Sequence, residues 1–307
     1  MAPVHLSRRS FLASTAAVAA SVAVPGCSPR ASGLPQGGAT SVDAARDTGP
    51  ALAARMPVAF VGHGAPTLAT DLVKGADLRR WASAMPRPRA IVVLSAHWED
   101  APVSVGFRSS NALMYDFRGF PDELYRMRYD APMPDELGRQ IVGLLGSDGS
   151  QVLTADRPLD HGAWVPLLHL VPDADVPVVQ VSLPTRQGAS NLIRIGQRLA
   201  SLRDEGVLLL GSGNLVHNLR RLAPDGSPVP GWASAFDAWA TEALEAGDID
   251  ALAQAASVGP DATLAHPTWE HWLPILVAAT AAEGAPVRFP VTGFEYGNIS
   301  RRCVQFG

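Results

Sequence analysis

The residues in this 307-residue chain with the widest chemical range are its eight histidines. Three of them, His63, His97 and His217, follow short apolar runs that end in small or polar residues. An imidazole can act as an acid or a base near neutral pH, and in its neutral form it is a common ligand for zinc, iron and copper. A lone histidine is more often a structural residue, so these residues indicate a site only if the fold brings several of them together.

The apolar runs predict the strands of a buried sheet. Each run is short, apolar on both faces and rich in Val, Ile or Leu, which is typical of parallel strands covered by helices. The predicted strands are residues 57–61, 90–94, 176–183 and 206–210. The helical stretches that alternate with them are residues 72–84, 134–145, 191–203, 232–246 and 269–282. This alternation predicts an α/β fold: a doubly wound, mostly parallel central sheet with helices on both faces, in a single domain over residues 56–307.

Such a fold would gather the three histidines at one edge of the sheet. Ligands of open α/β sheets bind outside the carboxyl ends of the strands, where His63, His97 and His217 are expected. Two further histidines stand in short motifs of their own. His161 lies in a turn-like Asp-His-Gly-Ala-Trp sequence, and His271 lies near the start of the last predicted helix. The pattern therefore favours a cluster of imidazoles able to hold a metal ion.

Other polar motifs have plainer explanations. His169 lies within an apolar stretch and is expected to pack there, and His266 precedes a proline and is expected to cap a helix. The Gly-Ser-Gly of residues 211–213 lacks the spacing of a nucleophile elbow, and the Gly-His-Gly of residues 62–64 lacks the lysine of a phosphate loop. The Gly-Ser-Gly-Asn of residues 211–214 could bind an anion through backbone N–H groups or could simply form a tight turn.

Composition excludes several classes of protein. With 47% apolar and 18% charged residues, the chain is not of the disordered or coiled-coil type. A formal net charge of −4 provides no basic surface for nucleic acid, so no nucleic-acid partner is expected. Two cysteines, Cys27 and Cys303, cannot make a multi-disulfide scaffold, and no disulfide is expected within the folded domain.

Residues 1–26 resemble an export signal. Arg8 and Arg9 form a twin-arginine pattern, and a short Ala/Val-rich stretch follows them. That stretch ends just before Cys27 in the manner of a bacterial lipoprotein cleavage site; an ordinary exported protein cleaved nearby is the alternative. Residues 27–55 are rich in small residues and proline, which predicts a flexible linker. We expect export to the periplasm or cell envelope, with membrane contact only through a lipid on Cys27.

Five short motifs occur in order along residues 56–307. They are Gly-His-Gly-Ala-Pro at 62–66, Ser-Ala-His-Trp at 95–98, Asp-His-Gly-Ala-Trp at 160–164, Gly-Ser-Gly-Asn-Leu-Val-His-Asn-Leu at 211–219 and Glu-His-Trp-Leu-Pro at 270–274. With the Tyr-Asp-Phe-Arg-Gly-Phe-Pro segment at 115–121 and the Gly-Phe-Glu-Tyr-Gly segment at 293–297, this set resembles the class III extradiol ring-cleavage dioxygenases. Within that family it is similar to the DOPA 4,5-dioxygenase subgroup.

The resemblance implies a role for each of five histidines. His63, His97 and His271 would be metal ligands. His217 would be either a further ligand or the catalytic base, and we expect it to contact the metal in the resting enzyme and to move a proton during turnover. His161 would be an acid or base near the substrate and O2. The resemblance thus implies a metal site with acid–base residues beside it.

One departure from the better-known members concerns the last ligand. The usual non-haem iron site has two histidines and one carboxylate, and here Glu270 stands next to His271. Neighbours on a helix point about 100° apart, so only one of the two would face the metal. The subgroup pattern selects His271, which leaves Glu270 as a supporting residue.

The implied reaction opens the ring of a catechol-type substrate with O2, next to the diol, to a muconic semialdehyde-type product. Fe(II) is the metal expected for activity, and Zn(II) could also bind a site made only of histidines. Tyr115, Phe117 and Trp98 would be aromatic walls for a flat substrate, or ordinary core residues. Two alternatives remain: a zinc-dependent hydrolase on a similar fold, and an envelope lipoprotein that binds a metal or ligand without catalysis.

Overall fold

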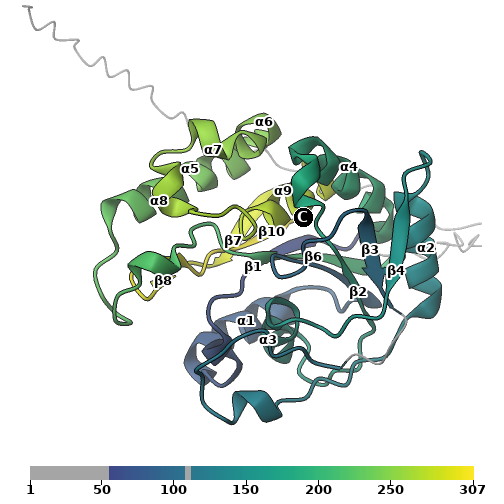
Figure 1. Cartoon of the computed structure of the whole chain (residues 1–307), viewed down its shortest axis with the longest axis horizontal. Helices are drawn as coiled ribbons and strands as arrows, with labels where there is room; N and C mark the ends of the chain where they lie inside the picture. The colour runs from purple at the N-terminus through teal and green to yellow at the C-terminus, as the bar shows by residue number, and fades with distance from the viewer. Residues whose placement is uncertain (1–54, 108–111) are drawn as a thin grey trace, which may run out of the picture. The chain divides into compact units, whose positions relative to one another are not determined.

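A mixed sheet of eight strands forms the centre of the computed structural model, which describes residues 55–107 and 112–307 (Figure 1). Its strand order is β4-β3-β5-β2-β6-β1-β10-β7. The four central strands are parallel: β5 (Val178–Val181), β2 (Ala90–Ser95), β6 (Val207–Gly213) and β1 (Val58–Gly62). These are the four strands that the apolar runs predict, and the α/β class with a mostly parallel central sheet is confirmed.

The edges of the sheet contain the antiparallel pairings. On one side β3 (Val103–Gly106) runs antiparallel to β5, and β4 (Val152–Ala155) lies parallel to β3. On the other side β10 (Cys303–Phe306) runs antiparallel to β1 and to β7 (Val287–Val291). A separate two-stranded hairpin joins β8 (Phe294–Glu295) to β9 (Ile299–Ser300).

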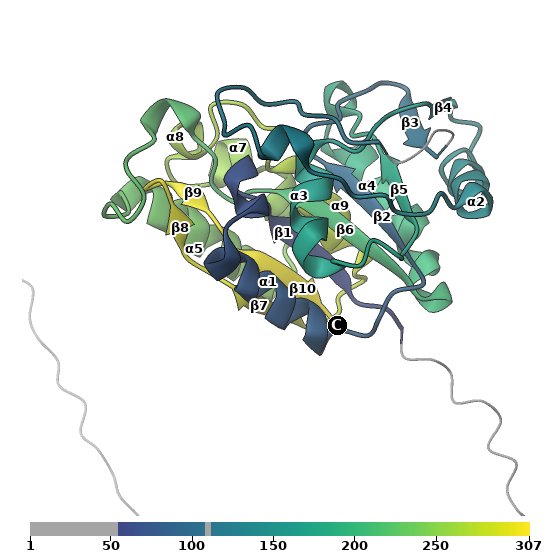
Figure 2. The same ribbon diagram turned by 90° about the horizontal axis from the view of Figure 1, so that it is seen from below.

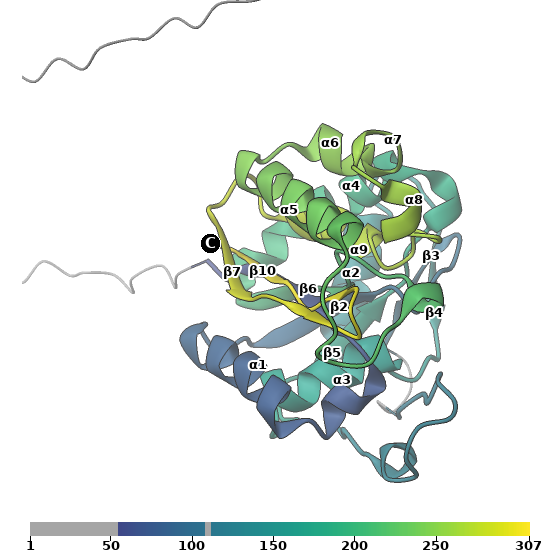
Figure 3. The same cartoon turned by 90° about the vertical axis from the view of Figure 1, so that its left-hand side faces the viewer.

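Helices cover both faces of the sheet (Figures 1 and 3). α1 (Leu72–Ala84) and α3 (His161–Leu170) lie on one face, where Figure 2 shows them in front of the strands. α4 (Ala189–Leu199) and α9 (Leu273–Ala281) lie on the other, and α2 (Asp135–Leu145) packs beside β3 and β4. The outer helices on the α9 side are α5 (Gly231–Ala246), α6 (Ile249–Ala253), α7 (Ala255–Val258) and α8 (Ala262–Ala265). Short 3-10 turns occur at Pro66–Ala69, Leu124–Arg126, Thr185–Gln187, Ala200–Glu205 and Leu219–Arg221.

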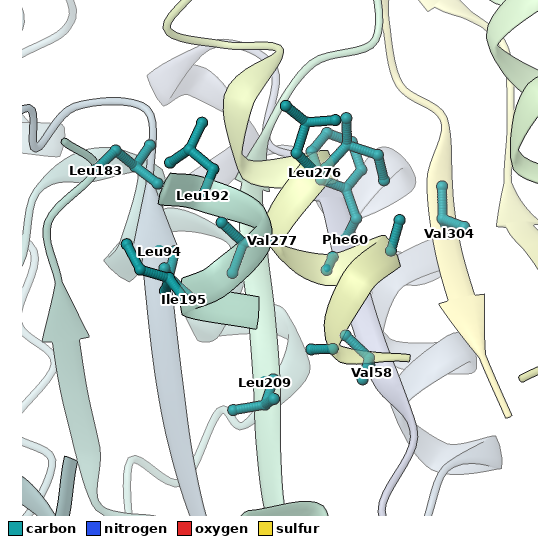
Figure 4. Packing of buried hydrophobic residues seen from close by; sticks show 14 of the residues in the cluster. Val58, Phe60, Leu94, Leu183, Leu192, Ile195, Leu209, Leu276, Val277 and Val304 are labelled. Carbon is teal, nitrogen blue, oxygen red and sulfur yellow. The ribbon is translucent and has the colours of Figure 1, made fainter. Parts of the chain in front are cut away.

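Alternation along the strands divides the core into two layers. In β1, Val58 and Phe60 join the apolar cluster under α4 and α9, whereas Ala59 and Val61 join the cluster under α1 and α3. Figure 4 shows the first layer, with Phe60 near Leu276 of α9. Because both faces are covered, β1, β2 and β6 are apolar at every position before their carboxyl ends, and β5 has one polar residue, Gln180. Polar residues are therefore concentrated where these strands end.

Three predicted boundaries differ from the structure. His161 begins helix α3, capped by the Asp160 side chain, and does not lie in a turn. The predicted helix 269–282 begins only at Leu273, so Glu270 and His271 lie in the turn before it. Strand β6 continues through Gly213, so residues 211–213 form a strand end and not a tight turn.

Cys303, the absence of a membrane-spanning helix among the described residues and the N-terminal segment are the remaining subjects of the sequence predictions. Cys303 is a free, buried thiol in β10. Among residues 55–107 and 112–307, no helix is both long enough and apolar enough to cross a membrane. The signal over residues 1–26, Cys27 and the linker over 27–55 lie outside the described residues, apart from Arg55. Arg55 forms ion pairs with Asp204 and Glu283.

Candidate active site

Five histidine side chains meet at the carboxyl edge of the parallel strands. His63 follows β1, His97 follows β2, His217 follows β6, His161 begins α3, and His271 precedes α9. The ring centroids of His63, His97 and His271 lie 4.9–5.2 Å apart. The His161 ring lies 4.0 Å from that of His97, and the His217 ring stacks on that of His271 at 3.5 Å. The structure thus brings all five predicted histidines together.

Glycine at the end of β6 allows this gathering. A Cβ added to Gly213 would overlap the backbone carbonyl oxygen of His271. The same oxygen accepts a hydrogen bond of 3.0 Å from the backbone N–H of Asn214. The backbone at residues 211–214 therefore holds the turn that carries His271. The N–H of Asn214 is used for this hydrogen bond and is therefore not available to an anion.

A proline in α3 determines how His63 is held. Pro166 has no N–H, so the carbonyl of Gly162 four residues earlier lacks its usual helical partner. The Ser212 hydroxyl donates to that carbonyl over 2.5 Å. Ser212 Oγ lies 2.9 Å from His63 Nδ1 and, with its proton committed to Gly162, it accepts from that nitrogen. The proton of His63 is thereby placed on Nδ1, and Nε2 keeps its lone pair.

Carboxylates fix the other rings in the same way. Glu270 Oε1 lies 3.0 Å from His271 Nδ1. Asp116 Oδ1 lies 2.9 Å from His161 Nδ1 and also accepts from the His161 backbone N–H, while its Oδ2 lies 3.5 Å from His97 Nδ1. A carboxylate accepts hydrogen bonds only, so in His161 and His271 the proton lies on Nδ1 and Nε2 is left free. The Asp116 carboxylate near His97 Nδ1 favours the same tautomer in that ring, although no hydrogen bond joins them.

The free nitrogens face one another. His63 Nε2 and His97 Nε2 are 3.2 Å apart, and ligand atoms of His63, His97 and His271 all lie within 4.8 Å of one another. Two lone pairs at this distance repel unless a cation lies between them. Two nitrogens bound to one metal at ~2.0–2.1 Å would be about 3 Å apart, which matches the His63–His97 separation. The donor set therefore fits a divalent transition metal.

Burial keeps these imidazoles neutral. Burial, and then the neighbouring histidines, lower the pKa of both His63 and His271 well below its ordinary value. Burial lowers the pKa of His97 to about 3. Metal ligands must be unprotonated, so these rings need release no proton to bind a metal at neutral pH.

His217 and Asp116 belong to neighbouring groups of donor atoms. His217, Glu270 and His271 form one group within 4.8 Å, and His97, Asp116 and His161 form another. Burial lowers the pKa of His217 to about 4. Burial alone would raise the pKa of Asp116, but its hydrogen bond and charge interaction with His161 outweigh this and hold it at about 2. Asp116 is thus a carboxylate at neutral pH.

The histidines open into a cavity of about 500 Å³, a size that accommodates a small organic ligand. Its lining comprises His63, Gly64, Ala65, Pro66, His97, Asp116, Phe117, Arg118, Phe120, His161, His217, Leu219, Leu222, His271, Glu295, Tyr296 and Ile299. Phe117 lines it as predicted, but Tyr115 and Trp98 do not. Tyr115 donates to the carbonyl of Met127, and Trp98 is buried under the Arg157 guanidinium.

His266 and His169 lie outside the cavity lining. His266 is buried against Phe236 and the tryptophans, and its Nε2 lies 2.8 Å from the Leu215 carbonyl. His169 is buried in α3, as the apolar stretch around it predicts. The sequence reasoning missed Ser212 and Arg118 as residues of the site. Ser212 stands at the end of β6, which is a signal for a site residue. Arg118 lies in the long connection between β3 and β4, and its only signal is its place in the 115–121 segment that carries the family resemblance.

Fold and site together define a class of metal-binding enzymes whose histidines line an aromatic-sized cavity at a sheet edge. The family model described as the catalytic LigB subunit of aromatic ring-opening dioxygenase matches residues 67–307. The chain therefore belongs to this family. It is an extradiol, metal-dependent dioxygenase, an oxidoreductase that opens aromatic rings with O2, and the resemblance seen in the sequence is confirmed.

Individual relatives agree with the family. The chain is 41% identical over 229 residues to a 4,5-DOPA dioxygenase extradiol of Beta vulgaris, covering 73% of this chain and 85% of that one. It is 37% identical over 259 residues to the protein of the same name in Escherichia coli K12, covering 82% and 95%. A crystal structure of an uncharacterized protein from Escherichia coli K12 matches with a TM-score of 0.69 and 35% identity, over 82% of this chain and all of the other.

Proposed function

We propose that this enzyme cleaves a catechol related to DOPA, using Fe(II) held by His63, His97 and His271. The observation that carries the proposal is the set of three neutral imidazoles whose Nδ1 atoms are held by neighbours and whose Nε2 atoms converge. The 4,5-DOPA dioxygenase names of the relatives support the substrate class. Bound Fe(II) would supply sites for the diol and for O2 and would exchange electrons with both.

The protein's own residues would position the substrate and move protons. Phe117, Phe120, Leu219 and Leu222 give the cavity apolar walls against which a flat ring can pack. His161, with its proton on Nδ1 against Asp116, presents Nε2 as a base for a substrate hydroxyl and can return that proton later. His217 is placed beside His271 as a second proton carrier, and its contact with the metal stays a prediction.

Two substitutions separate the ligand role from the acid–base role. His97→Ala should lower bound metal several-fold, since it removes one nitrogen from the metal. His161→Ala should keep the metal and lose turnover by about 10²–10⁴-fold, the range for a positioned acid or base. His169→Gln, a buried histidine outside the cavity, is the matched control. Metal content after anaerobic Fe(II) loading and O2 uptake with a panel of catechols are the measurements.

The outcomes distinguish the proposal from its alternatives. O2 uptake that depends on catechol and on Fe(II) supports it. No uptake with any catechol, together with hydrolysis by the zinc-loaded chain, would favour a zinc hydrolase. Full metal occupancy in both His63→Ala and His97→Ala would contradict the ligand assignment.

We further propose that the chain is exported. The motif around Arg8 and Arg9 is typical of the twin-arginine route, and Cys27 is positioned for lipidation after cleavage. The enzyme would then act in the periplasm or cell envelope, anchored by a lipid, with residues 27–55 as its linker.

A further inference from the structure

The cavity is larger than a bare catechol needs. Its volume of about 500 Å³ lies within the range of sites that enclose a whole small organic molecule. In the proposed function the diol lies at the histidines, so the opposite end of the ring points toward the rest of the cavity. The charges found there therefore determine which substituent the ring can carry.

Both carboxylates in the lining already have partners. Asp116 accepts from the backbone N–H of His161 and from its Nδ1. Glu295 is only 3% exposed; its Oε1 accepts from the Ala65 N–H at 2.8 Å, and its Oε2 lies 3.2 Å from Lys74 Nζ. Burial lowers the pKa of Lys74, but Asp225 and Glu295 outweigh burial and raise it, so this ammonium stays charged. The lining offers no free carboxylate to a cationic substrate group.

Arg118 is the opposite case. Apart from the histidines, it is the one basic side chain in the cavity lining over residues 55–107 and 112–307. It is exposed and has no hydrogen bond or ion pair with any residue in that part of the chain. It follows Phe117, whose ring is buried in the cavity wall, and precedes Gly119, whose φ of +77° turns the backbone. The Arg118 guanidinium thus lies next to Phe117 at the cavity wall and has no anionic partner among the described residues.

We propose that Arg118 binds the carboxylate on the side chain of the substrate, so that the enzyme selects catechols with an acidic tail. This inference rests on the proposed function, since it takes the diol to lie at the histidines. A guanidinium binds a carboxylate through two parallel N–H···O bonds, which a neutral amide cannot replace. With no free acid in the lining, an amino group on the tail would add little to binding. The acid, not the amine, would be the recognised feature of a DOPA-like substrate.

The test compares two substrates that differ only in charge. They are 3-(3,4-dihydroxyphenyl)propanoate and its primary amide, given to the Fe(II)-loaded full chain. Arg118→Gln should raise KM for the acid about three- to tenfold, as expected for an exposed but bidentate ion pair, and leave kcat and the KM of the amide unchanged. Arg126→Gln is the matched control, because Arg126 is an exposed arginine eight positions away that does not line the cavity. High salt should weaken the preference of the wild type for the acid. It should have no such effect on Arg118→Gln, which is expected to treat the acid and the amide alike.

A binding measurement separates this inference from the proposed function. 3-(4-Hydroxyphenyl)propanoate has one hydroxyl and cannot be opened as a catechol, so calorimetry reports its affinity without turnover. The wild type should bind it more tightly than its amide, and Arg118→Gln should bind both alike. An equal KM for acid and amide in the wild type, or an unchanged preference in Arg118→Gln, would overturn the role of Arg118 while leaving ring opening intact. If neither catechol is opened, the proposed function fails, and equal affinities for the phenolic acid and its amide would overturn the Arg118 site as well.

Discussion

At the scale of single residues, Asp116 matters because one carboxylate faces two histidines. Its Oδ1 holds His161 Nδ1 at 2.9 Å, and its Oδ2 faces His97 Nδ1 at 3.5 Å. In Asp116→Asn one of these oxygens becomes an NH2 group, which would point a donor at an N–H of one ring. We expect turnover to fall about 10- to 100-fold, the usual effect of removing a group that orients a ligand or base, while metal remains bound.

The measurement is kcat together with metal content. Asp122→Asn is the control, because Asp122 is 91% exposed and its only described partner is Arg126, in the same segment. Unchanged turnover in Asp116→Asn would show that the tautomers of His97 and His161 do not depend on this carboxylate.

The sequence could predict the site residues that lie at the ends of parallel strands, but not those in the long connections. His63, His97 and His217 follow strands of a parallel sheet, and such strands end at one edge, so their meeting follows from the strand pattern alone. Asp116 precedes His161 by 45 residues and follows no strand end. Its contact with His161 depends on the course of a long connection, which no local pattern specifies.

At the scale of elements, the end of β6 holds the turn that precedes α9. A Cβ at Gly213 would overlap the His271 carbonyl, so Gly213→Ala must move either the strand or that turn. We expect it to destabilise the fold by about 1–3 kcal/mol and to lower bound metal, since His271 moves with its backbone. Denaturant unfolding and metal content are the measurements.

Gly143 in α2 provides the matched control. It is exposed within the helix, and a Cβ there would meet no atom within 4 Å. Gly143→Ala should therefore stabilise the protein by about 0.5–1 kcal/mol through its better helix propensity and leave metal content unchanged. Equal effects of the two substitutions would contradict the proposed close approach at Gly213.

The elements that the sequence did not predict have physical reasons for being missed. Helix α3 contains Pro166 in its interior, which local rules treat as a helix breaker. It persists because nearly all its residues are buried, and because the Ser212 hydroxyl occupies the Gly162 carbonyl that the proline leaves free. The edge strands β4 and β7 are only partly buried, so their sequences lack the continuous apolar run that marks β1 and β2.

At the scale of the whole molecule, His169 links helix α3 to α1 and to the turn before it. Its Nδ1 accepts from Arg79, because a guanidinium can only donate, so the proton lies on Nε2 and is donated to the Leu68 carbonyl at 2.7 Å. Burial, and Arg79 beside it, lower the pKa of His169. In the unfolded chain a histidine takes up a proton below about pH 6.5, whereas folded His169 resists it. The unfolded state then binds more protons, so stability should fall as pH decreases from 7.5 to 5.5.

The comparison with His169→Gln isolates this contribution. Glutamine can offer one acceptor and one donor but does not titrate, so its free energy of unfolding should fall less over the same pH interval. Denaturant unfolding at pH 7.5, 6.5 and 5.5 measures the difference between the two proteins. Equal losses in both would exclude His169 as a source of acid sensitivity.

Export is the last prediction, and it also concerns the whole chain. If Arg8 and Arg9 direct the precursor to the twin-arginine route, which carries folded proteins, then changing both to Lys should leave the precursor and its ring-opening activity in the cytoplasm. Cys27→Ser should instead be exported but move from the membrane fraction to the soluble fraction, because a lipid on Cys27 would be the only anchor. Ser28→Ala, one position away, should behave as the wild type. Export of the double Lys variant would contradict the route, and Cys27→Ser that stays in the membrane fraction would contradict the anchor.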